Sequence, residues 1–282
     1  MIQIFLIILG LIWMVFAVVS DLKTSEIPDW LNISLVVFAL AGRLFYGLFI
    51  SSDPSGINNF SWFYQGLIGA GIFFVLGNLL YLGRMFAGGD AKLMMALGAI
   101  LPLTPSFFNN LNIFLLFFIL FFFAGAVYGI FSLFVVALRN RKKFPKKFRV
   151  VFKKHKNKVL GMGFFSLFLM AIGFSEISFF YFGLFVFITP YLYLTAIVIE
   201  KYFMIKKKQP KELQEGDWLY KEVKLSKNKK IKPSWGGLTK KDIKNLKKQN
   251  KKVWIRNGIP FSPVFLIAFI VLIYLIKSGF SF

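Results

Sequence analysis

The sequence contains no cysteine and a single histidine, and these absences remove several classes of active site. Without cysteine the chain has no disulfide, no thiolate ligand for zinc and no thiol nucleophile. The one histidine, His155, lies in a lysine-rich segment, so a Ser-His-Asp triad or a histidine metal site would depend on one poorly placed residue. We therefore expect no metal and no cofactor. Carboxylates remain as the groups available for acid–base chemistry.

Acidic residues are also scarce. The chain has 12 of them against 35 lysines and arginines, which gives a net charge of +23. Thirty of the 35 basic residues fall in two windows, 139–158 and 201–258. Such clusters are typical of the cytoplasmic loops of membrane proteins, which lie beside anionic lipids. Nucleic-acid binding would also fit the charge, but we favour anionic lipids as partners of these loops and expect no nucleic acid.

Apolar residues are abundant: the chain is 57% hydrophobic and 19% aromatic, with a mean hydropathy of +0.67. Runs such as NIFLLFFILFFFAGAVYGIFSLFVVAL do not occur in soluble domains. The composition predicts an all-α, polytopic helical membrane protein of about eight transmembrane helices, with a small polar cytoplasmic unit before the last helix. Residues 1–20 have no basic n-region and no small-x-small cleavage site, so we interpret them as a retained first helix.

Segments of spanning length occur at about 2–20, 31–50, 62–83, 111–138, 177–204 and 260–277, with two shorter ones at about 91–104 and 159–175. They predict a domain order of a catalytic membrane core of about five helices (1–138), a basic cytoplasmic loop (139–158), a helical hairpin (159–204), a basic cytoplasmic unit (205–258) and the last transmembrane helix (259–282).

The distribution of charge tests this count. With both termini outside, the loops 20–30, 84–90, 139–158 and 205–258 face the cytoplasm, and they contain nearly all of the lysines and arginines. The loops at 51–61, 105–110 and 176 contain none. Eight spans therefore satisfy the positive-inside rule. The same topology places Asp21 and Asp90 on the cytoplasmic side of the plasma membrane.

These two aspartates are the strongest candidates for chemistry. Asp21 closes the first apolar run in VVSDLKTSEIPDWLN, and Asp90 follows two glycines in RMFAGGDAKLMMALG. A carboxylate at the edge of a lipid-buried segment is costly and therefore indicates function. Two carboxyl groups that share a proton can hydrolyse an amide bond with water, one as the base and the other as a hydrogen-bond donor to the carbonyl. The pair predicts an intramembrane aspartyl peptidase.

The neighbouring residues allow more than one interpretation. Gly88 and Gly89 would let a substrate chain approach Asp90 closely, whereas glycines are also common where membrane helices pack; beside Asp90 we favour the first interpretation. Pro28 and Asp29 suit the start of the second span. Lys23 and Lys92 each follow a candidate aspartate by two residues, and we favour positive-inside flanks for both; the alternative is that they orient substrate or tune the aspartates.

Two further sequence features carry structural predictions. Thr239 and Asp242 have the spacing of a capping box, which predicts a short basic helix over about 240–250. Arg43 lies within the second span, where burial against a neighbouring helix or snorkelling accounts for it better than pairing with a carboxylate.

At the two aspartate motifs the chain resembles the GxGD-type aspartyl peptidases of the type IV prepilin peptidase family, most closely the archaeal preflagellin (prearchaellin) peptidases. The stretch from Asp21 to Asn32 resembles the first family motif, whose leading aspartate is catalytic, and GGDAK at 88–92 resembles the second. GDWLY, GGLT and IRNGIPFSPVFLIAF also resemble the archaeal branch. The chain departs from the family at Ala87, where the pattern has glycine.

The resemblance implies a function and a substrate class. It implies cleavage of class III signal peptides of archaellin or pilin-like precursors on the cytoplasmic side, with Asp21 and Asp90 as the catalytic residues. The bacterial enzymes of the family also carry a cysteine-rich zinc segment and methylate their products. Because this chain has no cysteine, we expect peptidase activity without N-methyltransferase activity.

Two other classes of function remain. A transporter or channel could use the aspartates as a proton or ion relay, although a relay needs groups near the membrane midplane and no inverted repeat is evident. A non-catalytic membrane scaffold whose basic loops bind lipid or a partner is the other alternative. We favour the peptidase over both.

Overall fold

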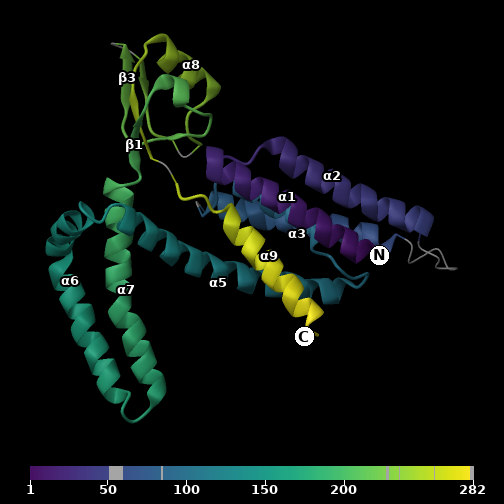
Figure 1. The fold of residues 1–282 in the computed structure, drawn as a ribbon, viewed down its shortest axis with the longest axis horizontal. Helices are drawn as coiled ribbons and strands as arrows, with labels where there is room; N and C mark the ends of the chain where they lie inside the picture. The colour runs from purple at the N-terminus through teal and green to yellow at the C-terminus, as the bar shows by residue number, and fades with distance from the viewer. Residues whose placement is uncertain (51–59, 84, 227–228, 235, 257, 280–282) are drawn as a thin grey trace. The chain divides into compact units, whose positions relative to one another are not determined.

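A computed structural model describes the whole chain except residues 51–59, 84, 227–228, 235, 257 and 280–282 (Figure 1). It divides into two compact units, one made of Met1–Tyr128 with Pro260–Phe282 and the other of Gly129–Ile259. The last apolar segment thus belongs with the first 128 residues. Most of the expected outer loop at 51–61 lies outside the described residues.

The first unit is a group of apolar helices. It contains α1 (Ile2–Thr24), α2 (Asp29–Phe45) continued by a π-helical turn (Tyr46–Ile50), α3 (Ser61–Leu82), α4 (Gly88–Ile100), the part of α5 (Phe107–Arg139) up to Tyr128, and α9 (Ser262–Lys277). Helices α1, α2 and α3 lie side by side, and α9 packs on α1 (Figure 1). An aromatic cluster of Phe73, Phe86, Phe117, Phe121 and Phe265 fills the core of this unit.

Among the described residues, five helices are long and apolar enough to cross a membrane: α1, α2 with its continuation to Phe49, α3, α5 and α7 (Ile177–Tyr202). Their lipid-facing surfaces carry many exposed apolar side chains, as expected where the solvent is hydrocarbon. The protein is therefore a polytopic helical membrane protein. Helix α4 has 13 residues, about 20 Å, and is shorter than a bilayer core of about 30 Å.

Helix α4 is held closely against α3 by small residues. Gly69 and Gly98 approach each other so closely that a side-chain carbon at either would overlap the other's carbonyl oxygen. At Gly77 such a carbon would lie 2.8 Å from the Ala91 carbonyl oxygen. Close backbone approach through glycine is a common way to pack helices in membranes. It fixes α3 and α4 as an antiparallel pair in one register.

Arg43 fastens the other end of α4. Its guanidinium is fully buried and donates hydrogen bonds to the carbonyl oxygens of Ala99 (3.0 Å), Ile100 (3.2 Å) and Pro102 (2.7 Å), and to that of Trp62 (2.9 Å). The last carbonyls of a helix have no partner within the helix and carry partial negative charge. Arg43 therefore caps α4, which confirms burial against neighbouring helices.

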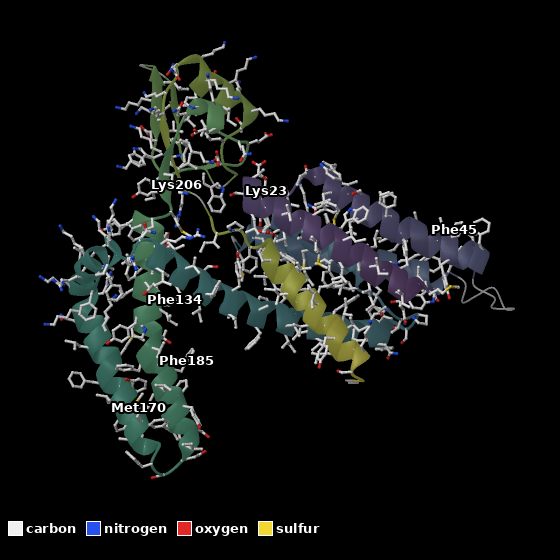
Figure 2. The ribbon with its side chains drawn as sticks, in the orientation of Figure 1. Lys23, Phe45, Phe134, Met170, Phe185 and Lys206 are labelled. Carbon is white, nitrogen blue, oxygen red and sulfur yellow. The ribbon has the colours of Figure 1, made fainter. Side chains whose placement is uncertain are left out.

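After the end of α5, the second unit continues as a helical hairpin of α6 (Phe144–Ile172) and α7 (Figure 2). Gly183 of α7 lies against Met170 of α6. Of the basic cytoplasmic loop predicted at 139–158, the part from residue 144 onward is helical and forms the first half of α6. That half is amphipathic: Phe148, Val151 and Phe152 pack toward α7 while the lysines face outward. The expected span at 159–175 is the second half of the same helix.

The polar unit after α7 contains two small sheets, which corrects the all-α prediction there. Its elements are β1 (Ile205–Lys208), a 3-10 turn (Pro210–Glu212), β2 (Trp218–Leu219), β3 (Val223–Ser226), β4 (Lys229–Ile231), α8 (Lys240–Lys248) and β5 (Val253–Arg256). One sheet has the antiparallel order β1-β5-β2, and β3 pairs with β4. The predicted capping box is confirmed, since the Asp242 amide donates to Thr239 Oγ1 and the Thr239 amide to Asp242 Oδ2.

Candidate active site

Asp21 lies in the last turn of α1, just before the connection at which the chain reverses direction. Ser25 ends the helix in the left-handed conformation (φ 59°), and its amide donates to the Asp21 carbonyl oxygen at 2.7 Å. This cap releases the chain into the short connection that leads to α2. The Asp21 side chain is only 7% exposed, so its carboxylate faces the interior of the unit and not the surrounding solvent.

The Asp21 carboxylate is held from the far end of the sequence. The backbone amide of Ser262, the first residue of α9, donates to Asp21 Oδ2 at 3.1 Å. The first amides of a helix lack partners within the helix and carry partial positive charge, so they stabilise a nearby carboxylate. The two residues are 241 positions apart. Sequence reasoning missed Ser262, since no local pattern links the start of the last apolar segment to the end of the first.

Asp90 lies in the first turn of α4, outside the five candidate spans, and is 8% exposed. Its Oδ2 accepts a hydrogen bond of 3.3 Å from the Ala87 amide. Burial, followed by the negative charge of Asp21, raises the pKa of Asp90 to about 7, against the opposing effect of that hydrogen bond. The two carboxyl groups therefore interact electrostatically, and both lie where an apolar helix meets a connecting segment.

The glycines before Asp90 differ in their surroundings. A side-chain carbon at Gly88 would meet nothing within 4 Å, whereas one at Gly89 would lie 3.4 Å from Ile27 Cβ. Neither glycine has a positive φ, so the turn does not require glycine for its backbone conformation. Ala87, which replaces the family glycine, has φ −74° and ψ 163°. Any residue adopts this extended conformation, so alanine at 87 imposes no strain on the turn.

Of the other predicted neighbours, Asp29 and Lys92 are brought together. Lys92 Nζ lies 2.6 Å from Asp29 Oδ1, which joins the first turn of α2 to the first turns of α4 at the solvent-exposed edge of the site. Pro28 occupies the N-cap position of α2, as its sequence context predicted. Lys23 is exposed in the last turn of α1 (Figure 2). The Asp29–Lys92 pair thus links α2 to α4 two residues after Asp90.

Two further polar residues lie buried in this unit. Asn32 of α2 is 2% exposed and Ser262 is fully buried. Their side-chain oxygen and nitrogen atoms have no hydrogen-bond partner within the described part of the chain. Among the described residues, no group of three or more histidine, cysteine, aspartate or glutamate side chains could hold a metal ion.

Comparisons with known proteins identify the family of the chain. Residues 8–130, which include both aspartates, match the model of the type IV leader peptidase family. The preflagellin peptidase of Methanococcus maripaludis is 30% identical over 164 residues, 54% of this chain and 68% of that protein. The preflagellin peptidase of Methanocaldococcus jannaschii is 36% identical over 95 residues, 34% of this chain and 37% of that protein. No solved structure gives a significant match. The chain therefore belongs to the type IV leader peptidase family, whose members are aspartic-type endopeptidases.

Proposed function

We propose that this protein is an intramembrane aspartyl endopeptidase that removes the class III signal peptide from archaellin or pilin-like precursors. Asp21 and Asp90 act together with one water molecule. The observation that carries the proposal is the burial of two carboxyl groups, one from α1 and one from α4, in the same helical unit, where burial first and the charge of Asp21 second raise the pKa of Asp90. Family membership and the names of both relatives support the substrate class.

The two carboxyl groups have different settings, and we assign their roles accordingly. Asp21, with its oxygen held by the Ser262 amide, is the ionised base that takes a proton from water. Asp90, whose raised pKa favours the protonated form, donates its proton to the scissile carbonyl oxygen. The hydroxide oxygen bonds to the carbonyl carbon and forms a tetrahedral diol. Asp21 then returns its proton to the amide nitrogen, the carbon–nitrogen bond breaks, and Asp90 recovers a proton from the diol.

The proposed topology has eight crossings in the plasma membrane, with both termini outside and the aspartates at the cytoplasmic face. The three crossings beyond the five candidate spans correspond to the part of α4 after Asp90, the second half of α6, and α9. The placement of lysine and arginine supports this topology, because short loops on the proposed outer side contain neither. The basic segments at 139–158 and 205–258 would then contact the anionic lipids of the inner leaflet.

The proposed substrates carry a short basic leader before an apolar helix, and basic loops repel such a leader. We propose that the acidic residues of the two aspartate motifs offset this repulsion; they are Asp21, Glu26, Asp29 and Asp90. Because the chain has no cysteine, we propose that it lacks the zinc segment and the N-methyltransferase activity of the bacterial enzymes.

Replacement of each aspartate tests the proposal. Asp21→Asn and Asp90→Asn each remove an acid–base group while keeping side-chain shape, so each is expected to reduce cleavage of a pilin-like precursor in membranes by at least about 1,000-fold. Glu176→Gln, the same chemical change at an exposed position between α6 and α7, is the matched control and should cleave normally. Cleavage that survives in either aspartate variant would refute the two-carboxyl mechanism.

A further inference from the structure

The residues that the structure describes contain three buried side-chain nitrogen or oxygen atoms without a hydrogen-bond partner, and all three lie in the first unit, which also contains Asp21 and Asp90. They are Nδ2 and Oδ1 of Asn32 and Oγ of Ser262. Folded proteins rarely leave such atoms unpaired, because each loses its hydrogen bonds to water and gains none in return. An unpaired carboxamide on a membrane helix is therefore expected to have a partner that comes from outside the chain.

Both residues belong to the elements that form the site. The Ser262 amide already donates to Asp21 Oδ2, so its hydroxyl lies beside the base. Asn32 follows Asp29 by one helical turn on α2, and Asp29 is paired with Lys92, two residues after Asp90. Ile27, at the start of the same segment, lies next to Gly89. Asn32 thus lies on α2 one turn beyond the residue that pairs with Lys92.

The packing of α1 against α2 gives the depth of Asn32. The two helices are antiparallel neighbours, and Trp13 Nε1 donates to Ser34 Oγ at 2.9 Å, which places these residues level with each other. Asp21 is eight residues from Trp13, about 12 Å along α1. Asn32 is two residues from Ser34 in the same direction, about 3 Å along α2. Asn32 therefore lies about 9 Å deeper in the apolar unit than Asp21, a distance that roughly three residues of extended chain would cover.

A peptidase that cuts beside a membrane helix must provide hydrogen-bond partners for the substrate main chain at this depth. Helical peptide bonds must unwind before water can attack them, and unwinding leaves main-chain N–H and C=O groups without partners where water is scarce. The carboxamide of asparagine offers both N–H donors and a carbonyl acceptor, so one side chain can satisfy both groups of a peptide unit. The apolar helix of the substrate follows the scissile bond and approaches from the membrane side.

We propose, building on the proposed function, that Asn32 is a substrate-positioning residue that hydrogen-bonds the unwound main chain about three residues after the scissile bond. Ser262 Oγ likewise hydrogen-bonds the substrate main chain beside Asp21, next to the scissile bond itself. The unpaired side chains of the enzyme and the unpaired main chain of the substrate complete each other, and bound substrate is thereby held extended across the two carboxyl groups.

Asn32→Leu tests this assignment, because stability and activity are expected to change in different ways. Replacing an unpaired buried carboxamide by an apolar side chain of similar size removes no internal hydrogen bond, so the thermal midpoint should hold or rise. Cleavage of a pilin-like precursor should fall by about 10- to 100-fold, the loss of one or two neutral hydrogen bonds. Asn32→Ser, which keeps a hydroxyl, should recover part of the rate. A lowered thermal midpoint, or cleavage at the wild-type rate, would overturn the proposal.

A modified substrate locates the contact. In precursor peptides, N-methylation of a single residue after the scissile bond removes one main-chain N–H donor. N-methylation at or near the third residue should slow cleavage by the wild type strongly, but slow cleavage by Asn32→Leu only a little. Equal sensitivity of both enzymes at every position would overturn the assignment. The proposed function fails separately: it is refuted if Asp21→Asn and Asp90→Asn still cleave, whereas this inference is refuted if Asn32→Leu cleaves normally while both aspartate variants are inactive.

Discussion

At the scale of single residues, the two aspartates are chemically alike but differ in their surroundings. Asp21 accepts a hydrogen bond from the first amide of α9, and Asp90 accepts one from the Ala87 amide at the start of its own helix. The pKa of Asp90 is nevertheless raised, because burial outweighs the hydrogen bond and the charge of Asp21 acts in the same direction. This difference supplies the asymmetry that an acid–base pair requires.

The raised pKa of Asp90 predicts the pH dependence of cleavage. In the proposed mechanism the active form carries a proton on Asp90, so the rate should fall as pH rises through about 7. Stability should follow the same direction: the folded-state pKa lies above the ordinary value of 3.8, so the contribution of Asp90 is full below about pH 4 and lost as pH rises to about 7. Initial rates between pH 5 and 9 test this, and a rate that keeps rising to pH 9 would contradict the assigned role.

At the scale of elements, α4 is the helix on which the site depends. Helix α4 is shorter than the bilayer core, and contacts with neighbouring helices fix its position. Gly69, Gly77 and Gly98 bring it against α3, Lys92 ties its first turns to α2, and Arg43 caps its last carbonyls. The sequence predicted a turn at Asp90 but not this anchoring, because the partners of Arg43 at the end of α4 and just beyond it lie 56 to 59 residues away.

Arg43→Leu is expected to destabilise the first unit, since it leaves the carbonyls at the end of α4 unpaired in an apolar setting. The cost should be about 2–4 kcal/mol, seen as a clear drop in the thermal midpoint, with cleavage reduced at temperatures where the fold loosens. Arg43→Lys should recover little, because one ammonium group cannot reach four carbonyls as a guanidinium fork does. Arg141→Leu, at an exposed position, serves as the control. An unchanged midpoint in Arg43→Leu would refute the capping role.

At the scale of the whole molecule, the sequence predicted what local composition determines. Long apolar runs specify membrane helices. The positions of Asp21 and Asp90 at the ends of such runs predicted that they are functional. The lysine-rich strands IKKK and KKI could not be predicted, because they lack the alternation of apolar and polar residues that identifies a strand. The sequence predicted a loop over the first half of α6 because the many lysines mask the apolar stripe of that helix. Contacts between distant segments, such as Ser262 with Asp21, have no local signal.

The central claim is that the side chains at positions 21 and 90 face each other across one site, and the absence of native cysteine allows a direct measurement. The Asp21→Cys/Asp90→Cys double variant, treated in membranes with a short bifunctional thiol reagent, is expected to form an internal cross-link. The Asp21→Cys/Leu48→Cys pair should not, because Leu48 lies at the far end of the segment that continues α2. A cross-link in the first pair and none in the second is the predicted result. Failure of the first pair to react within one chain, with both thiols accessible to the reagent, would contradict the account.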